Sequence, residues 1–161
     1  MTAKAALMID LGKLERNARR IVEALPGIEV AGVTKVTCGS PEVARAMLAG
    51  GVSAIGESRL ENVERLRAAG VDAPFWLLRA PTPELAEDTV RLTAISLLSE
   101  IETARALDAA AEAAGTRHGL VAMIDLGDLR EGMMPTSLPA FLDAAADLGV
   151  AELVGLGTSL T

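Results

Sequence analysis

The sequence is poor in the residues that build disulfides, metal centres and membrane spans. Its only cysteine, Cys38, excludes an internal disulfide, and its only histidine, His118, leaves no spacing typical of a metal site. No segment stays apolar for long enough to cross a bilayer. We therefore expect a cytoplasmic protein without a metal and without a membrane partner.

Positive charge is also in the minority. There are 15 lysines and arginines against 22 aspartates and glutamates, a formal net charge of -7, and no basic cluster offsets this balance. A nucleic-acid partner is therefore not expected. Half of the 161 residues are hydrophobic, which suits one domain with a sizeable core.

Short apolar segments alternate with helical ones along the chain. The predicted strands are residues 28–34, 52–56, 73–79, 92–98, 119–126 and 152–160, and residues 5–9 are a candidate for another. Helix starts are predicted at Asp10, at Ser40 followed by Pro41, and at two capping boxes that begin at Ser58 and Ser99. This alternation predicts a parallel α/β sheet, because each helix is the crossover between neighbouring strands.

Two parallel architectures fit such a chain, an open doubly wound sheet and an eight-unit barrel. There is no Gly-x-Gly-x-x-Gly turn after the first strand, and polar residues recur at the strand ends, which favours a (β/α)8 TIM-type barrel with its site at the carboxyl face. These strand-end residues are Lys35, Glu57, Arg79, Ser99, Asp125 and Thr158. We expect the 161 residues to form the first six or so strand-helix units, with an open edge, and to be the amino-terminal part of a longer protein.

Lys35 stands directly after the first buried strand. Desolvation at such a place can lower the pKa of a lysine toward that of a nucleophilic amine. The alternative is a lysine that buries its stem and lets its ammonium reach water. Glu57 and Arg79 either line the same pocket or pair with each other, and His118 is expected at the surface.

The residues around Lys35 resemble a known family. Residues 8–11 with Leu14 and Asn17 look like the opening of alanine racemases, and Val33-Thr34-Lys35 is similar to their cofactor-lysine segment. Residues 124–132, Ile-Asp-Leu-Gly-Asp-Leu-Arg-Glu-Gly, resemble the family's strand-five motif. The chain is thus similar to the amino-terminal barrel of alanine/ornithine racemase-type enzymes dependent on pyridoxal 5'-phosphate, and residues 34–39 look nearest to the ornithine racemase branch.

The resemblance implies roles for several residues. Lys35 would hold the cofactor as a Schiff base and move the α-proton of the external aldimine, and Arg130 would lie near the cofactor's phenolic oxygen and the substrate carboxylate. Thr158 and Ser159 would border the cofactor. The alternatives are an ion pair of Arg130 with Asp128 or Glu131, and hydroxyls that only terminate a strand.

Asp128 stands two residues before Arg130. It either receives the distal ammonium of a diamino acid such as ornithine or lysine, or it orients Arg130. The chain departs from the family in having no tyrosine, where alanine racemases have one shortly after the lysine and take a second base from the neighbouring subunit. The resemblance places that base and the phosphate-binding glycines beyond Thr161, in a full-length homodimer.

The resemblance therefore implies an amino-acid racemase that uses pyridoxal 5'-phosphate, with a small-molecule amino acid as its substrate. The main alternative is a homeostasis or carrier protein that binds the cofactor on the same lysine without turnover. A D-amino-acid aldolase or dehydratase on the same fold would be expected to need a metal, for which the chain offers few ligands.

Overall fold

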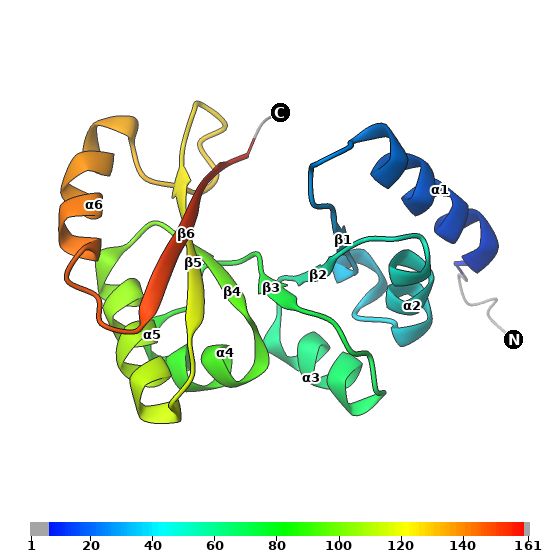
Figure 1. Cartoon of the computed structure of the whole chain (residues 1–161), viewed down its shortest axis with the longest axis horizontal. Coiled ribbons are helices and arrows are strands. Elements are labelled where there is room, and N and C mark those ends of the chain that lie inside the picture. Colours follow the sequence, from blue (N-terminus) through cyan, green and yellow to red (C-terminus); the bar gives the residue numbers. More distant parts are fainter. Residues whose placement is uncertain (1–6, 160–161) are drawn as a thin grey trace, which may run out of the picture.

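A single curved sheet of parallel strands organises the chain, in a computed structural model that describes residues 7–159 (Figure 1). The strands are β1 (Ala31–Val33), β2 (Ala54–Glu57), β3 (Phe75–Leu77), β4 (Ile95–Leu98), β5 (His118–Ile124) and β6 (Ala151–Thr158). Each strand pairs in parallel with the next one along the chain, in the order β1-β2-β3-β4-β5-β6. This unbroken order excludes a doubly wound sheet, in which the strand order reverses, and confirms the predicted barrel, here as a partial one.

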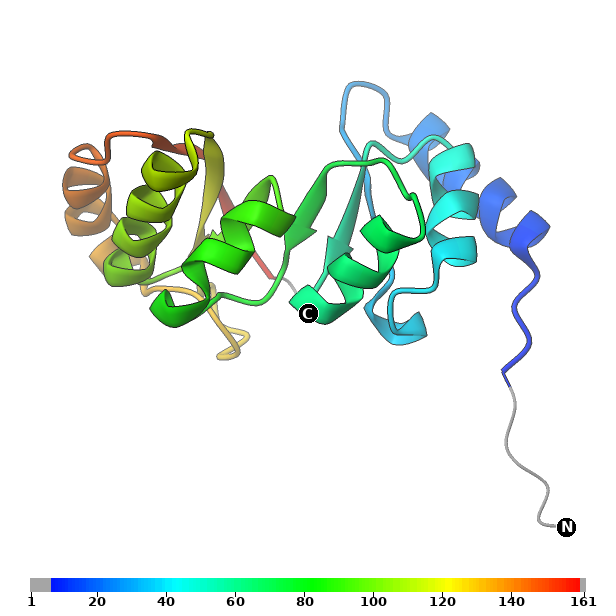
Figure 2. The ribbon, with the colours of Figure 1, turned by 90° about the horizontal axis from the view of Figure 1, so that it is seen from below.

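Helices follow one another along the sheet in chain order (Figure 2). They are α1 (Leu11–Ala24), α2 (Pro41–Ala49), α3 (Leu60–Ala68), α4 (Ala86–Leu92), α5 (Ile101–Ala114) and α6 (Leu138–Ala145). Residues 7–159 also contain short 3-10 turns: η1 (Lys35–Thr37), η2 (Pro83–Leu85) and η3 (Pro135–Ser137). Asp10 caps α1 by accepting a hydrogen bond from the Lys13 N–H, at 2.9 Å, and Ser40 caps α2, as predicted.

The hydrophobic core lies between the strands and the helices. In one half, Ile55 and Phe75 of the sheet pack with Leu66 of α3. In the other half, Leu120 packs with Leu107 of α5. The side chains of the opposite sheet face line an open hollow of about 490 Å³. Its apolar lining is Trp76, Ile95, Leu97, Val121, Met123, Val154 and Leu156.

Two predicted helix starts are wrong by one residue. The chain is still extended at Arg59 and at Glu100, so α3 and α5 begin after these residues, and neither Ser58 nor Ser99 acts as the cap. At Ser58 one reason is visible, because its backbone N–H donates to the Glu57 carboxylate, at 3.1 Å, and not to the Glu61 carboxylate as a capping box requires.

The strands are shorter than predicted at most ends. β1 covers residues 31–33 of the predicted 28–34, since only these pair with β2. Of the candidate strand at residues 5–9, residues 7–9 are not in a strand, and residues 5 and 6 lie outside the described residues. Within the described chain, no helix has the length and apolar character of a membrane span.

Candidate active site at the carboxyl ends of the strands

Lys35 begins the short turn η1 directly after β1. The preceding residue, Thr34, is fully buried, whereas Lys35 itself is exposed. Within residues 7–159 its ammonium takes part in none of the ion pairs. The expected apolar enclosure of this lysine is therefore absent in the described structure, and its side chain is open to solvent.

Thr34 holds the turn in place through its carbonyl oxygen. That oxygen accepts hydrogen bonds from the backbone N–H of Thr37 at 3.0 Å, from the Thr37 hydroxyl at 2.9 Å and from the N–H of Gly39 at 3.2 Å. Cys38 adopts a left-handed conformation, with φ of 52°, which lets the chain fold back within so few residues. The lysine is thus carried by a hydrogen-bonded loop rather than by a free strand end.

The loop after Lys35 is packed tightly against α3. Gly39 has φ of +64°, and a Cβ at this position would lie 2.8 Å from the Cβ of Asn62, so only glycine fits here. Arg65, also on α3, donates to the carbonyl oxygen of Cys38. Both contacts hold the end of residues 35–39, here called the lysine loop, against the first turns of α3.

The loop after β5 carries the second group of candidate residues. Asp125 accepts hydrogen bonds from the N–H of Gly127 at 2.7 Å and of Leu129 at 3.2 Å, and the Gly127 N–H holds the pKa of this carboxyl below its usual value even though burial opposes the shift. The backbone of Met133 returns to the strand end, where it bonds to Met123 and to Asp125. The loop is therefore closed on itself and presents residues 128–131 from a fixed base.

Arg130 reaches from this loop to the end of β6. Its Nη2 donates to the Ser159 hydroxyl at 2.5 Å and to Glu131 at 3.3 Å, and its Nε lies 3.8 Å from an Asp128 oxygen. The side chain is 62% exposed, so much of the guanidinium remains open to a ligand. Both ion pairs that the sequence left as alternatives for Arg130, with Asp128 and with Glu131, are thus present, and its role toward a cofactor stays a prediction.

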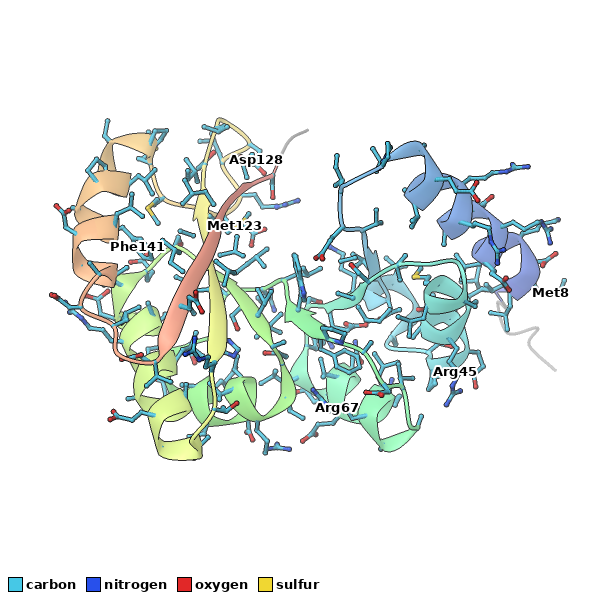
Figure 3. All side chains as sticks on the ribbon, in the orientation of Figure 1. Met8, Arg45, Arg67, Met123, Asp128 and Phe141 are labelled. Carbon is cyan, nitrogen blue, oxygen red and sulfur yellow. The ribbon has the colours of Figure 1, made fainter. Side chains whose placement is uncertain are left out.

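Asp128 differs from its neighbours in being enclosed. Its side chain is 2% exposed, and neither carboxylate oxygen has a hydrogen-bond partner among the residues that the structure describes. It lies where the β5–α6 loop meets the end of β6 (Figure 3). A buried carboxylate without hydrogen-bond donors is costly, and the Arg130 Nε, 3.8 Å away, is the cation that this one pairs with among the described residues.

Thr158 ends β6, and Ser159 follows it directly. Thr158 is exposed, and its hydroxyl donates only to the carbonyl oxygen of Ser159, over a long 3.4 Å. Ser159 is engaged by Arg130. The Thr158 hydroxyl is thus open to a further partner, whereas that of Ser159 serves to place the guanidinium.

The Lys35 turn and the Arg130 loop both lie at the carboxyl ends of the strands, but they follow different strands, β1 and β5. All strands are parallel, so the turn after β1 and the loop after β5 are both at the carboxyl edge, along the lower side of Figure 2. Among the described residues, none of the side-chain hydrogen bonds or ion pairs of Arg130 and Asp128 involves Lys35. The apolar hollow is lined mainly by residues of β3 to β6 and reaches Thr158 at the end of β6.

Other strand-end and polar residues behave differently from the expectations. Glu57 is fully buried and pairs with Thr34 and Asn62, not with Arg79, which is exposed on a separate hollow beside Arg59. The sequence identified Glu57 only as a strand-end residue and missed Asn62. An acidic strand end followed within one helical turn by an amide is the signal that points to this pair.

The expectation of a surface position for His118 is wrong. Its side chain is 1% exposed, and its Nε2 lies 2.9 Å from the Ser96 hydroxyl. Burial lowers the pKa of His118 from 6.5 to about 4. The residue begins β5, at the opposite edge of the sheet from Lys35, and so belongs to the core. Within residues 7–159, no group of three or more potential metal ligands is assembled.

Together these features define a class, the partial α/β barrel with an exposed lysine after the first strand and an arginine-bearing loop after the fifth. The sequence model described as "Alanine racemase, N-terminal domain" matches residues 9–160. The chain therefore belongs to the alanine racemase N-terminal domain family.

The chain is similar to curated amino-acid racemases. A lysine racemase from Thermotoga maritima is 38% identical over 156 residues, which cover 95% of this chain and 43% of that protein. An ornithine racemase from Acetoanaerobium sticklandii is 32% identical over 158 residues, covering 96% and 44%. The chain thus spans less than half the length of these relatives.

The fold is also found among solved structures. An alanine racemase from Clostridium difficile 630, in complex with cycloserine, matches with a TM-score of 0.79 and 22% identity, over 92% of this chain and 42% of that one. At this identity the match supports the partial-barrel fold alone.

Proposed function

We propose that this chain is the lysine-bearing part of an amino-acid racemase that uses pyridoxal 5'-phosphate. The observation that carries the proposal is an exposed lysine on a fixed turn at the same sheet edge as the Arg130 loop. Its membership of the alanine racemase family and its similarity to a lysine and an ornithine racemase support it. In the full-length protein we place further site residues outside residues 1–161 and expect a homodimer.

The residues present suit this cofactor. It carries an aldehyde, for which the free amine of Lys35 is the matching group, and anionic oxygens, for which the open guanidinium of Arg130 and the hydroxyl of Thr158 are donors. When bound, pyridoxal 5'-phosphate withdraws electrons from the α-carbon of an amino acid and so makes its α-proton removable.

The chain's own residues would handle the proton and the orientation. Lys35 Nζ would take the α-proton of one enantiomer from its own face of the α-carbon, while a second group delivers a proton to the opposite face; for the other enantiomer the two roles are exchanged. Arg130 orients a carboxylate or a phenolic oxygen through its planar fork. The apolar walls of the hollow, among them Trp76 and Leu97, would exclude water from a ligand bound against them. The chain has no tyrosine, so the group on the opposite face is assigned to another part of the protein.

For the substrate we propose a diamino acid. The buried Asp128 carboxylate has no hydrogen-bond donor among the described residues, and its contact with Arg130 Nε, at 3.8 Å, is too long for a hydrogen bond. The distal ammonium of ornithine or lysine would supply the missing donors. Similarity to racemases of these two amino acids agrees with this assignment.

The test is a racemisation assay on the full-length protein with L-ornithine, L-lysine and L-alanine, followed by separation of the enantiomers. We expect racemisation that is lost in Lys35→Arg, since arginine cannot act as the reacting amine, and retained in Lys13→Arg. A protein that binds the cofactor on Lys35 but racemises none of these amino acids would contradict the proposal and indicate a carrier.

A further inference from the structure

Glu57 is a buried carboxylate that no cation neutralises within the described chain. It ends β2, is 0% exposed and belongs to none of the ion pairs found in residues 7–159. A buried carboxylate is tolerated only when hydrogen bonds satisfy its oxygens. Oε1 accepts from the Thr34 hydroxyl at 2.6 Å, and Oε2 accepts from the Asn62 side-chain amide at 3.0 Å and from the Ser58 N–H at 3.1 Å.

The first of these bonds fixes the start of the lysine loop. Thr34 is fully buried. Its backbone N–H donates to the carbonyl oxygen of Gly56, at 3.2 Å, and its hydroxyl donates to Glu57. Its carbonyl oxygen in turn receives the backbone N–H groups of Thr37 and Gly39. The turn that carries Lys35 therefore depends on Thr34, and the side chain of Thr34 depends on Glu57.

The second bond fixes the end of the same loop. Asn62 donates to Glu57 and is also the residue against which Gly39 is pressed, with 2.8 Å between the Asn62 Cβ and the position that a Gly39 Cβ would take. One carboxylate thus connects the residue before Lys35 with the helix residue that its loop rests on. The link therefore joins the chain segment after β1, the end of β2 and the first turn of α3 around the residue Lys35.

We propose that Glu57 is a positioning residue for Lys35. Its carboxylate fixes Thr34 and Asn62, and these two residues hold the turn from which the lysine amine reaches its reaction partner. The inference rests on the proposed function, in which Lys35 is the reacting amine. If Glu57 only joined β2 to α3, its loss would lower stability without changing the lysine loop in the folded protein.

Hydrogen–deuterium exchange of the chain without cofactor tests the link directly. Thr34→Val removes the hydroxyl but keeps the shape, whereas Thr34→Ser keeps the hydroxyl. We expect the amides of Thr37 and Gly39 to exchange roughly tenfold faster in Thr34→Val, as for the loss of one charge-assisted hydrogen bond, and to remain near the unaltered rate in Thr34→Ser. Glu57→Gln, which keeps the size and removes the charge, should change these amides in the same direction.

Thr89→Val is the matched control. Thr89 is also fully buried, but its hydroxyl has no side-chain hydrogen-bond partner among the described residues and lies on α4, away from Lys35. This variant should leave the exchange of Thr37 and Gly39 unchanged. Equal exchange at these amides in Thr34→Val and in the unaltered chain, with a lower melting temperature, would overturn the positioning role.

A second readout follows the lysine itself. Each variant is mixed briefly with pyridoxal 5'-phosphate and reduced with borohydride, and the modification of Lys35 relative to Lys13 is measured by peptide mass spectrometry. We expect this ratio to fall roughly fivefold in Thr34→Val and to be restored in Thr34→Ser. An unaltered ratio contradicts the inference. If the unaltered chain shows no preference for Lys35, the proposed function fails, and the exchange data still decide the role of Glu57.

Discussion

At the scale of single residues, the buried Asp128 carboxylate is the most direct candidate for a specificity determinant. In the full-length protein, Asp128→Asn should lower kcat/KM for ornithine by roughly tenfold or more and that for alanine by much less, because only ornithine brings a second ammonium. Enantiomer assays with both amino acids measure this difference. An equal loss with both would show that Asp128 only supports Arg130.

Glu131→Gln is the matched control for that prediction. Glu131 also contacts Arg130, with 3.3 Å between Oε1 and Nη2, but its side chain is 37% exposed and better placed to stay solvated. Its substitution should change both substrates by similar, small factors, as expected for an exposed ion pair. A selective effect of Glu131→Gln on ornithine would move the specificity away from Asp128.

His118 makes the stability of the domain depend on pH. Burial lowers the pKa of His118 in the folded state from the ordinary 6.5 to about 4. Between these two pH values, His118 is protonated in the unfolded chain and neutral in the folded chain, so protonation favours unfolding. The contribution is complete above about pH 6.5 and is lost as the pH falls toward 4, by up to about 3 kcal/mol. Urea unfolding across this range should show the loss, and His118→Gln should remove most of it. The same pH dependence in His118→Gln would contradict this account.

Some of these residues could be found in the sequence and others could not. Lys35, Arg130 and Ser159 follow strands, and parallel strands bring their ends to one edge, so their common location was predictable. The buried state of His118 was not, because it depends on the fit of β5 against Ser96 of a neighbouring strand. The amide that follows Glu57 in the next helix hints at its bond to Asn62, but nothing in the local sequence shows that Glu57 also bonds to Thr34, 23 residues earlier.

At the scale of elements, Asp108 joins α5 to the start of β6. Its carboxylate accepts hydrogen bonds from the backbone N–H groups of Gly149 at 3.1 Å and of Val150 and Ala151 at 2.7 Å each. Burial raises the pKa of Asp108, but the three N–H groups together lower it by more. The bonds therefore stabilise the fold above the ordinary pKa of an aspartate and are lost as the pH falls below it.

Asp108→Ala should destabilise the domain by about 2 kcal/mol, because it leaves these N–H groups without their acceptor. The free energy of unfolding in urea measures the effect at neutral pH. Asp143→Ala, at an exposed position on α6, is the control and should change stability little. Similar values for both variants would show that the Asp108 bonds do not hold the strand.

The helices and strands themselves were predictable, because the spacing of hydrophobic residues and the positions of turn residues indicate the same boundaries between them. Their exact starts were less so: the capping boxes at Ser58 and Ser99 have the right residues, yet the chain remains extended for one residue more. At Ser58 the backbone N–H that a capping box would use donates to the carboxylate of Glu57, which tertiary bonds to Thr34 and Asn62 hold in place. Local propensity thus located the helices, and the packing of the strand ends decided where they begin.

At the scale of the whole molecule, the inner face of the sheet remains apolar and open. Val154 and Leu156 are 52% and 53% exposed, and the outer edge of β6 pairs with no strand of the described chain. We expect the 161-residue chain to self-associate, because such a face and edge both favour contact with another chain. Analytical ultracentrifugation over a range of concentrations measures this, and a monomer throughout that binds the cofactor tightly would contradict it.

The central claim is that Lys35 is the cofactor lysine, and covalent trapping tests it most directly. The chain has three lysines, Lys4, Lys13 and Lys35, so the measurement has two internal controls. Incubation with pyridoxal 5'-phosphate, reduction with borohydride and peptide mapping should place the label mainly on Lys35. A label distributed evenly over the three lysines, or concentrated on Lys13, would contradict the account.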